Sequence, residues 1–329
     1  MLIQGQYNMV NIREFKIGDA AKIYHLFTEH TNYKRDASFW VWINRMLADE
    51  KSIIVVAEKN GDIIGHYAII PRICNLKNKI ELKCGLGIHA FVEPNYRNLV
   101  SIFSITGLAY QISESKNYDF IYGFPNSNYR LIQERIERWK KVSVFNAFIK
   151  PLTISDSATF SLDWILLNEN DFNKFIILSE LLENENFSDQ IFFSKSLSYF
   201  LNRYIKHPQK LYQVWFLKKE GKIIGIIVTK QFKADDVRVH IIDYILSSNE
   251  YLSEMLDDFE LKFSKHASLS VLWPNSKYFS DLLIHKGYKQ TGFDTFFGIK
   301  ILSQKALDNQ DLLLDFNKWR LCMGDSDAF

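Results

Sequence analysis

The residues best suited to acid–base chemistry lie in one stretch, residues 87–97, which reads Gly-Ile-His-Ala-Phe-Val-Glu-Pro-Asn-Tyr-Arg. We expect a strand here that ends at Pro94, because proline cannot donate to a sheet ladder. His89, Phe91 and Glu93 then share one face of that strand, since side chains alternate between faces. Histidine titrates near neutral pH, so His89 could act as a general base, as could Glu93. Each also has a structural interpretation, as a hydrogen-bonded strand histidine and a surface carboxylate.

Other recognisable chemistries have no support in the sequence. We find no GxSxG elbow, P-loop, GxGxxG fingerprint or HExxH pair. The eight histidines form no cluster with metal-ligand spacing; His25 and His30, for example, are five residues apart and would not share a helix face. We therefore expect no bound metal.

Composition argues against a nucleic-acid or membrane partner. The chain has 329 residues, and its 40 basic and 38 acidic side chains leave a formal charge of +2, so no global field attracts a polyanion. The most basic run, residues 130–141, is interrupted by Glu134 and Glu137 and is typical of a solvated helix face. The high aromatic content, 15%, is best explained by core and interface packing.

The expected compartment is the cytoplasm. Three cysteines, an odd number without a CxxC pair, favour reduced thiols over a disulfide framework or a zinc site. The sequence shows neither a basic flank followed by an apolar stretch at its start nor an apolar segment long enough to cross a bilayer.

Two short matches indicate an internal duplication. Residues 124–129, Phe-Pro-Asn-Ser-Asn-Tyr, are echoed by residues 273–278, Trp-Pro-Asn-Ser-Lys-Tyr. Residues 61–65, Gly-Asp-Ile-Ile-Gly, are echoed by residues 221–225, Gly-Lys-Ile-Ile-Gly, and the order of the two matches is the same in each half. We therefore predict two domains, 1–150 and 151–329, that pack together.

The expected elements follow one order in both halves. Hairpins cross the turns at residues 59–61 and 219–221, where Asn-Gly and Glu-Gly stand. In the first half the expected elements are strands at 9–14, 52–58, 62–73, 80–92 and 118–123 and helices at 19–29, 38–47, 99–115 and 126–139. In the second half they are helices at 172–183, 194–204, 250–265 and 275–286 and strands at 213–218, 222–231, 237–246, 269–273 and 291–301. Residues 151–170 are expected to connect the halves.

This order of elements resembles that of the GNAT superfamily of acyl-CoA N-acyltransferases. Residues 92–97, Val-Glu-Pro-Asn-Tyr-Arg, are similar to the family segment Val-x-Pro-x-Tyr-Arg at the end of its fourth strand. The resemblance implies an α/β (α+β) fold of two tandem GNAT-like domains, each a mixed, mostly antiparallel sheet flanked by helices. Motif-level support covers residues 85–139.

The resemblance also implies an acetyl-CoA site in the first half. The family loop that holds the pyrophosphate corresponds to Arg97, Asn98, Leu99, Val100, Ser101 and Ile102, where both family glycines are replaced. Backbone N–H groups at the start of a helix suit a pyrophosphate, and Arg97 adds positive charge. Asn126 matches the family asparagine that bonds the pantetheine arm, although it could equally be a helix cap. In the second half, acidic residues from Glu250 to Glu260 would repel a pyrophosphate.

For catalysis, the resemblance implies a base near the thioester, either His89 or Glu93, and a backbone N–H near Phe91 or Val92 for the oxyanion. The family's tyrosine acid on the last helix is absent, since Gln133 and Glu134 stand at that place; Tyr129 and Tyr122 are the nearby substitutes. The tail, residues 324–327, is similar to the ending of two-domain relatives, and its carboxylates are expected in solvent.

The leading hypothesis is an N-acetyltransferase that carries acetyl from acetyl-CoA, a co-substrate, to a small-molecule amine. The second half would be a degenerate copy that shapes the acceptor site. Family analogy suggests an amino sugar, or its nucleotide derivative, in surface-polysaccharide synthesis as the acceptor. The alternatives are an aminoacyl transferase of the peptidoglycan cross-bridge type and a non-catalytic binding or scaffold protein. The sequence leaves the oligomeric state open.

Overall fold

The computed structural model describes residues 10–31, 37–46, 50–77, 80–153, 159–168, 172–183, 190–233, 237–265, 269–273 and 276–327. Five parts of the predicted features lie outside these ranges: Met9, Leu47, residues 154–158, residues 169–170, and the Pro274-Asn275 pair of the second repeat. No described helix is long and apolar enough to cross a membrane.

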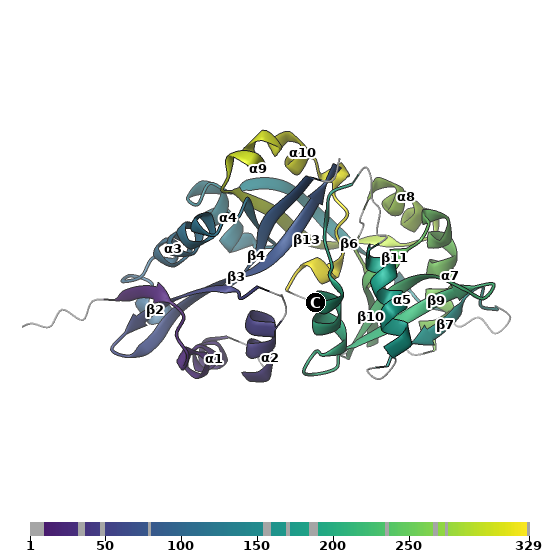
Figure 1. Ribbon diagram of the computed structural model, residues 1–329, viewed down its shortest axis with the longest axis horizontal. Coiled ribbons are helices and arrows are strands. Elements are labelled where there is room, and N and C mark those ends of the chain that lie inside the picture. Colours follow the sequence, from purple (N-terminus) through teal and green to yellow (C-terminus); the bar gives the residue numbers. More distant parts are fainter. Residues whose placement is uncertain are drawn as a thin grey trace, which may run out of the picture.

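The first half forms one side of the molecule (Figure 1). Its hairpin β2–β3 turns at Asn60 and Gly61, both at positive φ, as an Asn-Gly turn requires. Helices α1 and α2 lie on one face of its sheet and α3 and α4 on the other. Its elements are β1 (Asn11–Glu14), α1 (Asp19–His30), α2 (Ala37–Val41), β2 (Ile53–Lys59), β3 (Asp62–Leu76), β4 (Ile80–Val92), α3 (Ile102–Ser115), β5 (Phe120–Gly123), α4 (Ser127–Arg135) and β6 (Lys140–Pro151).

The second half repeats this arrangement and adds a C-terminal segment. Its elements are β7 (Asp163–Leu166), α5 (Phe172–Glu183), β8 (Phe192–Phe193), α6 (Leu197–Phe200), β9 (Tyr212–Lys219), β10 (Lys222–Lys233), β11 (Val237–Leu246), α7 (Leu252–Phe263), β12 (Leu269–Leu272), α8 (Lys277–His285), β13 (Lys289–Ile301), α9 (Gln304–Asp308) and α10 (Gln310–Leu314). Strand β6 was not predicted, and β7 lies within residues 151–170, which were expected only to connect the halves.

The two halves exchange their last strands. The sheet runs β1-β2-β3-β4-β5-β13-β6-β12-β11-β10-β9-β7, so β13 pairs with β5 of the first half and β6 pairs with β12 of the second. The pairs β4–β5 and β11–β12 are parallel, and the other pairs of described strands are antiparallel. The predicted fold class is confirmed. The domain boundary at residue 150 stays a prediction, because the strands on either side of it belong to one continuous sheet.

An aromatic cluster fills the junction between the halves. Tyr122 of β5 stacks on Phe193 of β8 with ring centroids 4.0 Å apart. Trp319 of the C-terminal segment packs 5.4 Å from Phe193 and 5.0 Å from Phe297 of β13. These rings come from both halves and from the tail, so burying their large apolar surface holds the three parts together. At this junction the aromatic residues serve core and interface packing, as expected from the sequence.

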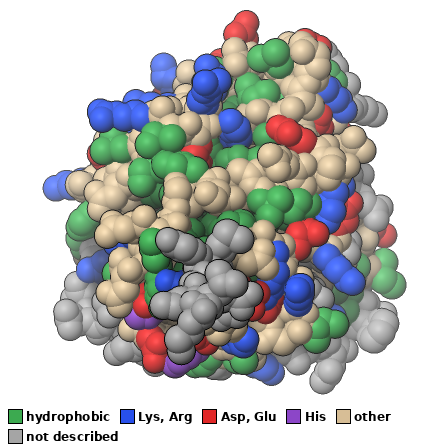
Figure 2. Space-filling view, turned by 90° about the vertical axis from the view of Figure 1, so that its left-hand side faces the viewer, with side chains coloured by type: hydrophobic (Ala, Val, Ile, Leu, Met, Phe, Trp, Pro, Cys, Tyr) green, Lys and Arg blue, Asp and Glu red, His purple; other side chains and the backbone are tan. Residues whose placement is uncertain are grey.

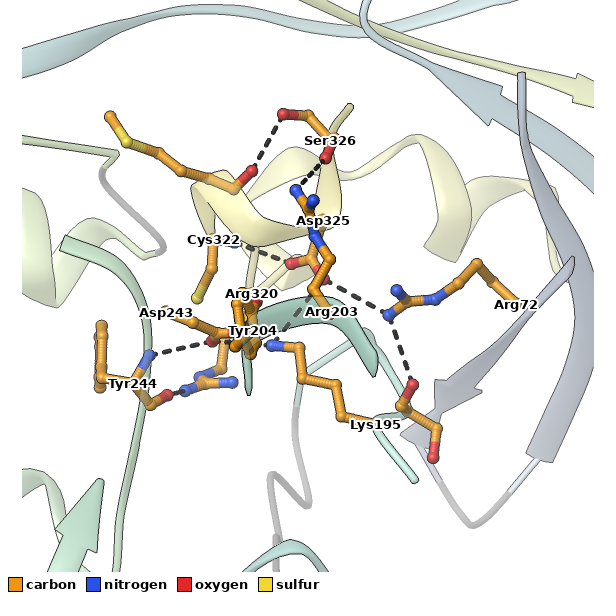
Figure 3. Close-up of polar contacts among 12 residues, drawn as sticks. Arg72, Lys195, Arg203, Tyr204, Asp243, Tyr244, Arg320, Cys322, Asp325 and Ser326 are labelled. Atoms are coloured by element: carbon orange, nitrogen blue, oxygen red, sulfur yellow. Dashed lines mark hydrogen bonds and ion pairs between the residues drawn. The ribbon is translucent and has the colours of Figure 1, made fainter. Parts of the chain in front are cut away.

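The C-terminal tail is buried, and the expectation that its carboxylates lie in solvent is wrong. Asp325 is 2% exposed. Arg72 from β3 and Lys195 approach its Oδ1 atom to 3.6 and 3.8 Å. The Arg203 guanidinium donates to the Ser326 carbonyl at 3.0 Å. Figure 3 shows these groups converging between the halves. A buried carboxylate beside two cations is costly to remove, because its partners then stay charged and unpaired.

Asp243 completes this buried cluster from β11. It accepts hydrogen bonds from Lys195 at 2.8 Å and from the Tyr204 hydroxyl at 2.6 Å. Burial would raise the pKa of Asp243, but the Lys195 charge and these hydrogen bonds hold it below its ordinary value. A carboxylate with a lowered pKa stabilises the folded state above its unfolded pKa, and that contribution is lost as the pH falls into the acid range.

Replacing Asp325 by Asn should lower the free energy of unfolding by about 3 kcal/mol, since Arg72 and Lys195 lose a buried counter-charge. Asp311→Asn, on the exposed side of α10, is the matched control and should change it by less than about 0.5 kcal/mol. Chemical denaturation of the two variants measures both values. Equal stability of the two variants would show that the tail does not hold the halves together.

Candidate functional site

A bulge in β4 opens the sheet of the first half. β4 pairs with β5 only from Cys84–Phe120 to Leu86–Tyr122. On its other side, β4 pairs with β3 at Phe91–His66 and again at Ile88–Ala68, so two residues, His89 and Ala90, stand opposite one. His89 has a φ of 54°, a left-handed conformation that non-glycine residues rarely adopt. Such a bulge bends the strand, and β4 leaves β5 from this point on.

His66 holds the bulge in place. Its Nδ1 atom lies 3.1 Å from the His89 carbonyl, and because a carbonyl only accepts, Nδ1 carries the proton. His66 is fully buried, and desolvation, aided by the neighbouring His89, lowers the pKa of His66 to about 3. The ring is therefore neutral at physiological pH. Phe27 of α1 packs against both histidine rings at centroid distances of 5.4 Å.

A cleft of about 220 Å³ lies where β4 and β5 separate. Three of the predicted site residues line it: His89 from β4, and Asn126 and Tyr129 from the start of α4. The full lining is Tyr67, Gly87, Ile88, His89, Ala90, Gly123, Phe124, Pro125, Asn126, Tyr129, Gln133 and Asp327. The cleft thus brings residues of β3, β4, the start of α4 and the C-terminal tail together around one space.

Asn126 and Tyr129 are each engaged within the chain. The Asn126 side-chain oxygen accepts from the Tyr129 backbone N–H at 2.9 Å, so Asn126 is the N-cap of α4. The amide NH₂ of a capping asparagine remains a donor, which keeps its predicted ligand role open. The Tyr129 hydroxyl donates to Glu137 at 3.3 Å, and burial, with the charge of Glu137 and the Tyr67 phenol, raises the Tyr129 pKa far above its ordinary value. Tyr129 is thus a poor proton donor to a ligand.

The other predicted strand residues lie outside the cleft lining. The Glu93 carboxylate is 3.8 Å from His30 Nε2, on the α1 side, and the Phe91 ring packs 5.6 Å from Phe27. The Val92 carbonyl accepts from Arg97 Nε at 3.1 Å. The next N–H, that of Glu93, bonds to β3, so the Val92 N–H points away from β3, toward the gap beside β5. The predicted roles of these residues stay predictions.

The loop before α3 uses some of its N–H groups internally. Both Leu99 and Val100 donate to the Tyr96 carbonyl at 2.9 Å. Val100, where the family has glycine, is 4% exposed and packs in the core beneath α3. Ser101 caps the helix by accepting from Phe103 N at 3.2 Å. The N–H groups of Ser101 and Ile102 have no acceptor among the described residues, so they remain available to an anion at the helix start.

Sequence reasoning missed Tyr67, Gln133 and Asp327 as cleft residues. Gln133 is buried one helical turn beyond Tyr129, and the family comparison noted its position only as the place of an absent tyrosine. Asp327 reaches the cleft from the tail, which the sequence indicated only as an acidic ending. Tyr67 carries no motif and is one of 16 tyrosines in the chain.

The equivalent place in the second half is filled. Asp243 stands three residues before Leu246 of β11, as His89 stands three before Val92, and Leu246 and Val92 pair with the repeated glycines of the two hairpins. Asp243 is 1% exposed and ion-paired to Lys195. The tail packs on it: a Cβ built on Gly324 would lie 3.2 Å from the Asp243 carboxylate. A buried ion pair therefore occupies this position in the second half (Figure 3).

The field at the start of α7 is weaker than the sequence suggested. Part of the acidic charge there is neutralised, because Lys219 bonds both oxygens of Glu254 at 2.7 and 2.8 Å. Glu250 follows the Ser248 cap and has no cation within ion-pair distance among the described residues. The buried Lys195–Asp243 pair, more than the charge at α7, distinguishes the second half from the first.

Comparison with known proteins gives a partial sequence match and a fold match. No family model matches the chain. A stretch of 74 residues is 32% identical to the uncharacterized N-acetyltransferase YhfO of Bacillus subtilis (strain 168), covering 21% of this chain and 50% of that protein. The matched stretch thus spans about half the length of this relative.

Solved structures match over nearly the whole chain. A GCN5-related N-acetyltransferase from Anabaena variabilis superposes with a TM-score of 0.67 at 12% identity, over 89% of this chain and 73% of its own. Saccharomyces cerevisiae N-myristoyltransferase with bound myristoyl-CoA superposes with a TM-score of 0.59 at 10% identity, over 88% and 82%. The resemblance expected from the sequence is confirmed at the level of the fold: the chain has the tandem fold of the GNAT superfamily.

Proposed function

We propose that the chain is an acyl-CoA-dependent N-acetyltransferase whose coenzyme site lies in the first half. The observation that carries this proposal is the cleft where β4 and β5 separate. The pantetheine arm of the coenzyme would lie in this cleft, between the two strands. The available N–H groups of Ser101 and Ile102, together with Arg97, suit the pyrophosphate. The GNAT fold and the partial match to an N-acetyltransferase support the same activity.

Each predicted residue has a role under this proposal. The Val92 N–H, directed toward the gap, would donate to the thioester carbonyl oxygen, where negative charge develops as the amine attacks. His89 lies in the cleft, held by its left-handed backbone and by His66, where it would accept the proton of the attacking amine directly or through water. The Asn126 amide would donate to the pantetheine arm. Glu93 is 16% exposed beside His30 and is the second candidate base.

The acceptor is proposed to be a small amine, such as an amino sugar or its nucleotide derivative in surface-polysaccharide synthesis, acetylated in the cytoplasm. The second half, with its tail reaching the cleft through Asp327, would shape the acceptor side. An aminoacyl-tRNA donor is less favoured, since it would need a basic groove. On the face shown in Figure 2, Lys and Arg side chains are interspersed with Asp and Glu.

Calorimetric titration with acetyl-CoA should give about one site per chain. Arg97→Ala should weaken binding roughly tenfold or more, because a charge-assisted phosphate contact is lost. Arg135→Ala, which removes an exposed arginine at the end of α4, is the control for net charge, and Glu250→Ala is the control for the second half. Two equivalent sites per chain, or one site whose affinity is unchanged in Arg97→Ala, would overturn the assignment. No binding at millimolar coenzyme would favour the scaffold alternative.

Variants of His89 distinguish the role of its imidazole from the role of its backbone conformation. His89→Ala and His89→Gly should both lower turnover roughly a hundredfold, the usual scale for loss of a general base, with little change in coenzyme affinity. Glycine accepts the 54° φ without strain, so the glycine variant should be more stable than the alanine variant by about 1 kcal/mol. An amine panel assayed by free thiol release measures turnover. If His89→Gly retains its turnover, the imidazole is not the base, and His89 contributes only its left-handed backbone conformation.

A further inference from the structure

The Tyr67 hydroxyl is a buried polar group without a hydrogen bond. Tyr67 is 1% exposed, and its hydroxyl makes no well-formed hydrogen bond to the described residues. The neighbouring Tyr110 hydroxyl is engaged elsewhere, because it donates to Glu137 at 2.7 Å and accepts from Trp139 Nε1 at 3.1 Å. A buried hydroxyl left unpaired destabilises the fold, so its retention calls for an explanation.

The hydroxyl lies over the point where the sheet opens. Tyr67 is the residue of β3 opposite the β4 bulge, between the pairs His66–Phe91 and Ala68–Ile88. A Cβ built on Gly87 would overlap the Tyr67 hydroxyl, so the glycine leaves room for it against the β4 backbone. Tyr67 and Gly87 both line the cleft. The unpaired hydroxyl therefore lies at the wall of the cleft, against Gly87, next to the space proposed for the thioester.

The other phenol of the cleft, that of Tyr129, already donates its hydrogen bond to Glu137. Glu137 is 7% exposed and accepts hydrogen bonds from Thr106 at 2.8 Å, from Tyr110 at 2.7 Å and from Tyr129 at 3.3 Å. This carboxylate draws the Tyr129 proton away from the cleft. Of the two tyrosines that line the cleft, only Tyr67 has a hydroxyl hydrogen to offer a ligand.

The Tyr67 phenol is suited to donate a hydrogen bond without losing its proton. Burial first, and then the negative charge of Glu137, raise the pKa of Tyr67 far above its ordinary value. The phenol thus stays neutral at every physiological pH and is a weak acid toward a thiolate. Such a group stabilises developing negative charge through a fixed hydrogen bond, without proton transfer.

On the basis of the proposed acyl transfer, we propose that the Tyr67 hydroxyl donates a hydrogen bond to the coenzyme sulfur as it leaves. The amine nitrogen attacks the acyl carbon, the new C–N bond forms, and the C–S bond breaks with its electron pair on sulfur. The amine proton passes to His89 or water. Tyr67 retains its own proton and holds the thiolate, which takes a proton from solvent on release.

The test uses free coenzyme A and needs no acceptor amine. A hydrogen bond to the thiolate lowers the thiol pKa, so the bound coenzyme should titrate about one to two pH units lower on the native chain than on Tyr67→Phe. The ultraviolet absorbance of the thiolate, followed against pH, gives this value. Tyr118→Phe, another buried tyrosine near the sheet but outside the cleft lining, should leave it unchanged.

The stability of the variants provides a second readout. Tyr67→Phe should fold and be as stable as the native chain or more so, since it removes an unpaired buried hydroxyl, whereas Tyr110→Phe, which loses a bond to Glu137, should be less stable. A purely structural role for Tyr67 predicts the reverse. If coenzyme A binds and its thiol titrates alike on native and Tyr67→Phe chains, the inference fails. If coenzyme A does not bind the native chain, the proposed function itself fails.

Discussion

The left-handed backbone at His89 is the constraint on which the candidate site depends. With two residues of β4 set against one of β3, the strand turns away from β5 after Leu86, and the two edges separate instead of completing their ladder. The neutral His66 ring donates to the His89 carbonyl and stabilises that conformation from within the core. Strain of this kind persists only where the surroundings enforce it, and here they do so at the mouth of the cleft.

Strand exchange and the buried tail explain why two similar halves differ. Because β13 completes the first sheet and β6 the second, neither half presents a free edge at the junction. The tail then crosses the junction, where Asp325 meets Arg72 of the first half and Lys195 of the second. It packs against Asp243 at the place equivalent to His89. One segment therefore packs against Asp243 in the second half, and its Asp327 lines the cleft of the first half.

Local patterns predicted the elements well because their causes are local. The repeated Gly-x-Ile-Ile-Gly turns give both hairpins, and the helix at residues 172–183 has the predicted bounds. Strand β6 was missed because Lys140 and Lys141 open it and Asn146 interrupts it, and its burial depends on β12 and β13, more than 100 residues away. Strand pairing between residues so far apart in the sequence cannot be predicted from a local hydrophobic pattern.

The site was predictable only where a motif marks it. The Val-Glu-Pro-Asn-Tyr-Arg segment led to the cleft and to His89, but nothing in the sequence separates Tyr67 from the other tyrosines. Asp325 was expected in solvent, because the cations that neutralise it, Arg72 and Lys195, are far away in sequence. Roles that arise from long-range neighbours became visible only when the fold brought those neighbours together.

The central claim, one acyl-CoA site built on the β4 bulge, is tested most directly by a crystal structure of the chain with bound coenzyme A. The account predicts the sulfur in the cleft between His89 and Tyr67, and the pyrophosphate at the N-terminal end of α3 beside Arg97. Coenzyme found against β11 and α7 of the second half, or held outside the cleft with β4 and β5 closed together, would contradict it.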